Sequence, residues 1–180
     1  VSSDDLMRNK CYRMDMKRLN EMRKHVSYEE YLLSLEMECH ILKINDTNIE
    51  RVTQLINKTN QFNFTTKRYT LNEVRSTVED NNSISFCASL KDKFGDNGIV
   101  SVLFARIEGD KAIIDLWIMS CRVFNRNLEF VVFSELINKC KKLGIKYING
   151  IYIPTVKNKY IENLYPNLGF YNIEKDEKKM

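Results

Sequence analysis

Three consecutive segments of alternating apolar and polar residues, joined by very short turns, constrain the fold more than any other feature of the sequence. Every second residue is apolar between residues 84 and 90, which predicts a strand with one buried face. Residues 94–98 indicate a tight connection, because Asn and Gly accept positive φ angles. A second strand at 99–107 leads through a turn at 108–111 into a third strand at 112–119. Strands joined by such short turns are antiparallel, so the sequence predicts a three-stranded meander.

The segment 128–143 predicts a long amphipathic helix. Lysines fill its last turn and Gly144 follows it, which is typical of a helix C-terminus. A further strand is predicted at 145–153. Because a helix of this length joins the two strands, the second strand should run parallel to the first. The apolar stripe of the helix consists of Leu128, Val131, Val132, Leu136, Cys140 and Leu143.

The N-terminal part predicts two helices and a first strand. Residues 6–23 place charged and apolar side chains at helical spacing, which indicates a partly buried connecting helix. Ser27 and Glu30 form a capping box that begins a short helix ending near Leu33. Alternation over residues 35–44 then predicts a strand with one buried face.

Two further capping boxes, at 47–50 and 70–73, predict two helices before the meander. After the parallel strand we expect a helix at 156–168, interrupted near Pro166, and a last strand at 170–173. This order of elements predicts an α+β fold in α/β/α layers. Its central sheet should be mixed, mostly antiparallel, and flanked by helices on both faces.

The composition is typical of a soluble intracellular protein. An apolar fraction of 43% supports a buried core, and a net charge of +4 is too small to indicate nucleic-acid binding. The five cysteines show no C-x-x-C spacing, and the sequence contains only two histidines. We therefore expect neither a metal site nor a disulfide framework. No apolar run reaches membrane-spanning length. We therefore expect a cytoplasmic protein that binds no nucleic acid, no membrane and no metal.

The stretch 54–69 gathers more amides, hydroxyls and cations than a structural role requires. Ordered polar loops of this kind often line a binding site. The alternative is a loop that satisfies itself, in which Asn60, Asn63 and Thr66 bond their own backbone. Residue composition leaves both interpretations open.

A second candidate site follows the third strand of the meander, where Ser120-Cys121-Arg122 leads towards the long helix. Amides at a helix start attract phosphate and other anions, and Arg122 and Arg126 add charged donors. Such positive surroundings favour a reactive Cys121 thiolate. The alternative is that Cys121 acts as an inert small apolar residue.

The predicted hairpin geometry places an acid near this cysteine. If the turn at 108–111 folds the strands back on each other, residues whose numbers sum to about 219 lie opposite one another. Cys121 would then face Gly98, and Val123 would face Asp96. The alternative is that Asp96 is only a turn residue.

Several motifs carry a resemblance to known families. The tail, with Lys157-Asn158 followed by Leu164-Tyr165-Pro166-Asn167-Leu168-Gly169-Phe170, resembles a GNAT-type acyltransferase domain. A more specific resemblance is to the C-terminal, GNAT-like half of FkbH-like proteins. Residues 1–33 resemble the helical segment that connects that half to an upstream HAD-type phosphatase domain, and 34–180 correspond to the GNAT-like domain. The motifs that carry the FkbH-like resemblance are 54–63, 65–70, 94–98, 120–122 and 154–158.

The resemblance implies a role in loading a glyceryl unit. FkbH-like proteins take a bisphosphorylated glycerate and hold the acyl group as an enzyme thioester. They pass it to the phosphopantetheine thiol of an acyl carrier protein in polyketide-type biosynthesis and remove the remaining phosphate. The phosphatase nucleophile motif Asp-x-Asp-x-Thr is absent from this sequence, so the chain would supply only the acyl-handling part. The implied co-substrate is the phosphopantetheine arm of the carrier protein, or CoA, and the chain would carry no cofactor of its own.

The resemblance also implies roles for individual residues. Cys121 would be the acyl-bearing nucleophile, and Asp96 would orient or deprotonate it. The substrate-binding set would be Asn60, Gln61, Asn63, Thr66, Arg68 and Arg122, with the first three gripping the glycerate hydroxyls. The pantetheine-binding set would be Arg122, Arg126, Asn127, Asn158 and Tyr165.

One departure from the GNAT pattern bears on the co-substrate. GNAT domains bind the pantetheine pyrophosphate with an R/Q-x-x-G-x-G/A loop, and the aligned residues here are Arg122, Asn125 and Asn127. Asn accepts left-handed φ angles, but its side chain blocks close approach of a pyrophosphate. The alternatives to glyceryl transfer are therefore a module that only docks the carrier protein, or a CoA-dependent N-acetyltransferase. Tyr165 resembles the tyrosine that protonates the departing thiolate, or else packs in the core.

Overall fold

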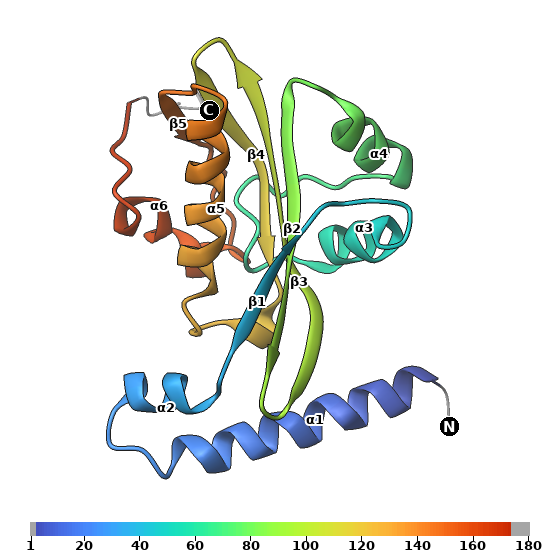
Figure 1. The fold of residues 1–180 in the computed structure, drawn as a ribbon, viewed down its shortest axis with the longest axis vertical. Helices are drawn as coiled ribbons and strands as arrows, with labels where there is room; N and C mark the ends of the chain where they lie inside the picture. The colour runs from blue at the N-terminus through green and yellow to red at the C-terminus, as the bar shows by residue number, and fades with distance from the viewer. Residues whose placement is uncertain (1–2, 174–180) are drawn as a thin grey trace.

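The computed structural model describes residues 3–173 of the chain as one sheet covered by helices (Figure 1). The elements before the meander are α1 (Ser3–Met22), α2 (Tyr28–Ser34), β1 (Glu38–Leu42), α3 (Ile49–Lys58) and α4 (Leu71–Glu79). The meander consists of β2 (Ser83–Asp92), β3 (Gly95–Glu108) and β4 (Lys111–Met119). The elements after it are a 3₁₀ turn at Cys121–Val123, α5 (Leu128–Lys142), β5 (Tyr147–Gly150), a second 3₁₀ turn at Lys159–Ile161 and α6 (Leu164–Asn167).

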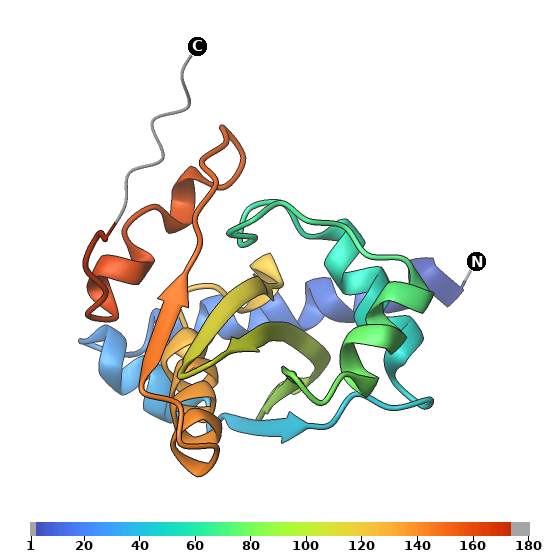
Figure 2. The same cartoon turned by 90° about the horizontal axis from the view of Figure 1, so that it is seen from above.

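The sheet has the order β1-β2-β3-β4-β5. The first four strands are antiparallel neighbours, and β5 runs parallel to β4. Helices α3 and α4 cover one face, and α5 and α6 cover the other (Figures 1 and 2). The predicted α/β/α arrangement, the meander and the parallel crossover are confirmed.

Each face of the sheet packs a separate apolar core, because side chains of the strands alternate between the two. One core joins α3 and α4 to Val102, Phe104 and Leu116. The other joins α5 and α6 to Phe86 and Trp117. A β-bulge between Phe104 and Ala105 shifts the pairing of β3 with β4 by one residue.

The first half of the chain differs from the prediction in two places. The strand expected at 35–44 is reduced to β1, because Leu35 ends α2 in a helical conformation. The capping boxes at Ser27 and Thr70 supply their side-chain caps, but the one at Thr47 does not form. The Thr47 hydroxyl instead donates to Asn45 Oδ1 (2.6 Å), so Asn48 becomes the N-cap of α3.

The C-terminal part is less regular than predicted. Strand β5 ends at Gly150, and only two short helical turns form within 156–168. The strand expected at 170–173 does not form in the described part of the chain. Gly169 adopts a φ of +91°, and the Phe170 amide turns back to donate to the Tyr165 carbonyl (3.0 Å). The Phe170 ring consequently packs on Tyr165 instead of extending a strand.

Helix α1 lies across the tip of the β2–β3 hairpin (Figure 1). Its Arg18 forms a buried ion pair with Asp92, at 2.6 Å. Met14 packs so closely on Gly95 that a Cβ there would lie 2.1 Å from the Met14 sulfur. The helix is therefore fixed to the hairpin by a narrow set of contacts. Within residues 3–173, no helix combines the length and apolar character needed to cross a membrane.

Candidate functional site

The polar stretch after α3 lies in an opening of the sheet. Strands β4 and β5 pair only as far as Ile114 and Gly150, and then diverge. Figure 2 shows the segment after α3 and the segment after β5 approaching each other above the end of β4. The backbone contacts that hold the stretch there are an antiparallel bridge of Asn63 with Ile118, Met119 N donating to Phe62 O (3.2 Å) and Ile153 N donating to Phe64 O (2.8 Å).

Two aromatic side chains anchor this stretch in the core. Phe62 and Phe64 are buried, and both rings pack against Trp117. The Phe64 ring also stacks on Tyr165, with 4.1 Å between ring centroids. Because these aromatics fix the backbone, the polar residues between and after them keep a defined orientation.

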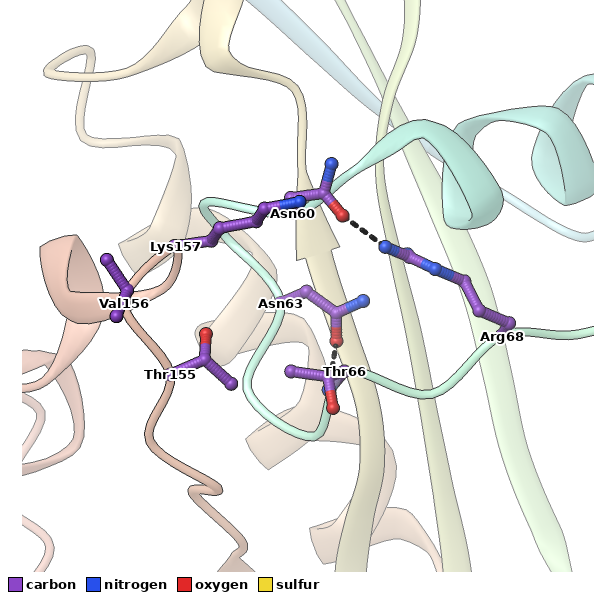
Figure 3. Close-up of a pocket in the computed structure, with 7 residues that line it drawn as sticks. All are labelled: Asn60, Asn63, Thr66, Arg68, Thr155, Val156 and Lys157. Atoms are coloured by element: carbon purple, nitrogen blue, oxygen red, sulfur yellow. Dashed lines mark hydrogen bonds between the residues drawn. The ribbon is translucent and has the colours of Figure 1, made fainter.

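A pocket of about 360 Å³ opens where this stretch faces the segment after β5 (Figure 3). Four of the residues predicted to bind substrate line it together. Gln61 is exposed outside this lining, and Arg122 lies at the loop before α5. The lining residues are Asn60, Asn63, Thr66, Arg68, Thr155, Val156 and Lys157.

Asn158 joins the two walls of this pocket. Its side chain is fully buried, and its Nδ2 donates to the carbonyls of Asn63 (3.0 Å) and Ile153 (2.9 Å). Its Oδ1 accepts from the Thr155 amide (2.7 Å). The polar atoms of the Asn158 side chain are therefore bonded to backbone groups, and they hold the two walls of the pocket together.

Six of the seven lining residues of this pocket have polar or charged side chains, and two of these residues, Arg68 and Lys157, are cations. Arg68 donates to the carbonyls of Ile56 and Thr59 (both 2.7 Å) and to the Asn60 side chain, which fixes its guanidinium at the rim. Lys157 is exposed at the opposite wall. The seven lining residues include no Asp or Glu. An anionic group would therefore be favoured here over an amine.

Both interpretations of the polar stretch hold in part. Asn63 Oδ1 accepts from the Thr66 amide (2.9 Å), and Thr66 adopts a φ of +57°, as in a self-satisfied loop. The same side chains nevertheless line the pocket (Figure 3). Internal hydrogen bonds thus hold the loop in place while it forms one wall of a cavity.

A second pocket, of about 240 Å³, has Phe62 in its lining. Phe62 lines this second pocket, and its neighbour in the chain, Asn63, lines the first. The lining of the second pocket consists of Phe62, Met119, Phe124, Asn125, Glu129, Tyr160, Ile161, Asn163, Leu164 and Asn167. It therefore runs from the end of β4 to the start of α5.

The loop at residues 121–127, called the α5 loop below, delivers the chain to the start of α5. Asn125 and Asn127 both adopt a φ of +61°, so the two positions aligned with GNAT glycines are left-handed. Asn127 is the N-cap of α5, and its side chain makes no capping hydrogen bond. The helix thus begins with backbone amides at its positive end, and Arg122, earlier in the same loop, has an exposed side chain.

Arg126, predicted to bind pantetheine, points towards the β2–β3 hairpin. Its side chain is only 8% exposed and lies 3.3 Å from the Asp92 carboxylate. It also donates to the Arg122 carbonyl (3.0 Å). Burial, with Arg18 close by, lowers the pKa of Arg126. Its charge is therefore used to hold the α5 loop against the hairpin.

The predicted pairing of Cys121 with Gly98 and of Val123 with Asp96 is wrong. Strand β4 ends at Met119, and Cys121 begins a 3₁₀ turn in which its side chain is exposed. Asp96 lies within β3 opposite Lys91, where its carboxylate accepts from the Gly98 amide (2.7 Å). The hairpin turn falls at Lys93 and Phe94, and residues 95–98 belong to β3. Neither pocket is lined by Cys121 or Asp96.

Tyr165 is packed inside the core. Its ring stacks on Phe64 and lies so close to Gly150 that a Cβ there would be 2.5 Å from the ring. Its hydroxyl is buried without a hydrogen-bond partner in the described part of the chain, and burial raises the pKa of Tyr165. It lines neither pocket, so its place in the structure favours the packing interpretation.

Sequence reasoning missed three contributors to these sites. Thr155 and Lys157 belong to the motif at 154–158, which predicts no role for them. Their position after the parallel strand is nevertheless one that lies near the opening of the sheet. Tyr160, at the second pocket, carried no signal beyond being aromatic.

Comparisons with known proteins place the fold. No protein-family model and no curated protein sequence matches the chain. Solved structures do match. The ribosomal-protein-S18-alanine N-acetyltransferase from Escherichia coli is 13% identical, with a TM-score of 0.54 over 73% of this chain and 77% of that one. An aminoglycoside antibiotic 6′-N-acetyltransferase from Acinetobacter baumannii is 10% identical, with a TM-score of 0.58 over 77% and 94%.

The fold is GNAT-like. A domain from Methanocaldococcus jannaschii has the same architecture, at 16% identity and a TM-score of 0.63 over 79% of this chain and 94% of that one. At these identities the likeness establishes the GNAT-like fold alone. None of the three structures carries an FkbH-like name, so that part of the resemblance stays a prediction.

Proposed function

We propose that this chain is an acyltransferase domain that exchanges an acyl group with a pantetheine thiol, on CoA or on a carrier protein. The GNAT-like fold supports the proposal, since two of the similar structures are named N-acetyltransferases. The observation that carries it is the α5 loop, in which Asn125 and Asn127 adopt left-handed φ angles directly before the amides at the start of α5, a position that favours phosphate. The pocket of about 240 Å³ begins beside this loop and leads to Met119 at the end of β4.

The residues of the α5 loop fit a pantetheine phosphate with one restriction. The amides at the start of α5 and the Arg122 guanidinium would hold the phosphate, and the second pocket would take the arm. The side chains of Asn125 and Asn127 hinder the close backbone approach that a pyrophosphate needs. The arm of a carrier protein, with its single phosphate, fits this loop better than CoA does.

The second participant would lie in the pocket of about 360 Å³. Arg68 and Lys157 give this pocket positive charge, and no acid lines it. An ammonium group there would meet two cations and no carboxylate to hold or deprotonate it. A small carboxylate or phosphate ester is therefore the favoured substrate, and amines of the aminoglycoside kind are disfavoured.

A glycerate-derived acyl group meets these requirements, so we propose it as the specific substrate. The amides and hydroxyls of Asn60, Thr66 and Thr155 would pair with its hydroxyls, and Lys157 with its phosphate. The pantetheine sulfur would attack the carbonyl carbon of an acyl phosphate, forming a C–S bond as the C–O bond breaks, and the thiol proton would leave with the departing phosphate. An acyl carrier protein would supply the thiol, with an upstream HAD-type domain acting on the remaining phosphate.

Transfer through a Cys121 thioester is a second candidate. The observation that favours it is the exposure of Cys121 next to Arg122 at the end of β4. Direct transfer is preferred, because Cys121 lines neither pocket. The two routes differ in one species, an acyl adduct on Cys121, which only the second requires.

Replacing Lys157 by alanine tests the anionic site. We expect 3-phosphoglycerate to stabilise the wild-type chain in a thermal-shift titration, and Lys157→Ala to weaken its binding by about tenfold, the loss of one charge-assisted hydrogen bond. Lys159→Ala is the matched control, because it removes the same charge two residues along and outside the pocket lining. Equal binding by the two variants, or stabilisation by spermidine instead of phosphoglycerate, would contradict the proposed substrate class.

A further inference from the structure

The N-terminal helices contact the α5 loop from below the sheet. The Tyr28 hydroxyl, at the start of α2, donates to the Asn125 carbonyl. Arg122 Nη1 donates to the Cys11 sulfur of α1 (3.3 Å). Two segments far apart in the sequence are thus joined at the loop assigned above to phosphate binding.

A buried charge cluster provides a third connection. Arg18 of α1 binds both carboxylate oxygens of Asp92, with distances of 2.6 and 2.9 Å. Asp92 lies within 3.3 Å of the Arg126 guanidinium, and Arg126 in turn donates to the Arg122 carbonyl. The Arg18, Asp92 and Arg126 side chains are 4%, 0% and 8% exposed, so water screens these charges weakly. The chain of contacts runs from α1 through the hairpin to the α5 loop.

Asn125 is held at both of its polar ends. Tyr28 binds its carbonyl, and the Tyr160 hydroxyl donates to its Oδ1 (2.9 Å). The Tyr160 ring also stacks on Phe124, with centroids 4.7 Å apart and planes at 8°. A left-handed φ costs free energy in a residue with a side chain, so surrounding contacts must maintain it.

We propose that α1 and α2 form a positioning element for the α5 loop, and that Tyr28 is a positioning residue for phosphate binding there. Tyr28 is 47% exposed, so burial does not impose its hydrogen bond to Asn125. The coupling of the helices to the loop follows from the contacts themselves. Only the identity of the ligand, a pantetheine phosphate, rests on the proposed function.

Tyr28→Phe tests the coupling by removing one hydroxyl and keeping the ring. We expect hydrogen exchange of the amides at residues 122–128 to become about three- to tenfold faster, the effect of losing one hydrogen bond. The Kd for CoA should rise by a similar factor, and the melting temperature should change little. Tyr12→Phe is the matched control, since it removes the hydroxyl of an exposed tyrosine on α1.

Two readouts keep this inference separate from the proposed function. Unchanged exchange at residues 122–128 in Tyr28→Phe would overturn the coupling, whatever the affinity for CoA. Exchange that is equally accelerated in Tyr12→Phe would also overturn it. Faster exchange confined to Tyr28→Phe, in a chain that binds no CoA at all, would support the coupling and reject the proposed function.

Discussion

Replacing Asp92 by alanine is expected to lower the free energy of unfolding by about 3–5 kcal/mol, because it leaves buried arginines without their shared partner. The Asp92 side chain is fully buried and pairs with Arg18 and Arg126. It also accepts from the amides of Phe94 (2.9 Å) and Gly95 (3.1 Å), which form the hairpin turn. One substitution therefore removes partners from α1, the hairpin and the α5 loop together.

The contribution of Asp92 to the free energy of unfolding should fall as the pH is lowered. Burial acts to raise the pKa of Asp92, but its hydrogen bonds and charge interaction with Arg18 outweigh burial and hold that pKa below its ordinary value. A carboxyl whose pKa is depressed by folding contributes stability above its unfolded pKa, near ~3.9, and loses it as the pH falls through the lower folded value. Wild type and Asp92→Ala should therefore differ fully at neutral pH, and the difference should shrink as the pH falls below about 4.

Urea denaturation at pH 7 and at pH 3 measures both parts of this prediction. Asp46→Ala is the control, because Asp46 forms a comparable ion pair with Arg75 (2.6 Å) while remaining 83% exposed. Exposed pairs contribute about 0–1 kcal/mol, so this control should remain close to wild type. A stability loss in Asp92→Ala no larger than that of Asp46→Ala would show that the buried cluster does not hold the N-terminal helices in place.

Replacing Phe64 by alanine should be equally destabilising, at about 3–5 kcal/mol, because it deletes a buried aromatic ring from the core. Phe64 is fully buried and contacts Tyr165 and Trp117. It is also the residue whose carbonyl accepts from Ile153, across the opening between β4 and β5. The loss of the Phe64 ring should make the polar stretch that lines the larger pocket more mobile, as well as lower the free energy of unfolding.

Two measurements distinguish local mobility of this pocket-lining stretch from a general loss of stability. Trypsin should cleave Phe64→Ala faster at Lys67 and Arg68 under native conditions, and 3-phosphoglycerate should no longer shift the melting temperature. Phe130→Ala is the control, since this phenylalanine of α5 is 47% exposed. If Phe64→Ala keeps the wild-type cleavage rate and ligand response, the loop is not anchored by this ring.

Local pattern predicted most of the fold. Alternation over the meander and the stripe of α5 are strong periodic signals, so these elements lie where they were expected. The predicted Thr47 cap and the predicted strand at 170–173 failed because a competing local hydrogen bond or a tertiary contact determined the structure there. Asn45 captures the Thr47 hydroxyl, and Phe170 turns onto Tyr165. Neither preference is visible in hydrophobic periodicity.

The sequence predicted which residues belong to the candidate site better than it predicted how they are arranged. The amide-rich stretch could be identified from composition, but its meeting with Thr155 and Lys157 depends on how far β4 and β5 diverge. Side-chain direction was the least predictable quantity. Arg126 faces an inward carboxylate, and the strand ends before Cys121 can pair across the hairpin.

Binding of CoA to the start of α5 tests the central claim most directly. Isothermal titration of the wild-type chain should show saturable 1:1 binding, and Asn127→Gly should bind more tightly. Glycine accepts the φ of +61° and removes the obstructing side chain, which makes no capping bond. Arg122→Ala should weaken binding by about tenfold. Absence of CoA binding in both the wild-type chain and Asn127→Gly would contradict a pantetheine site at this loop.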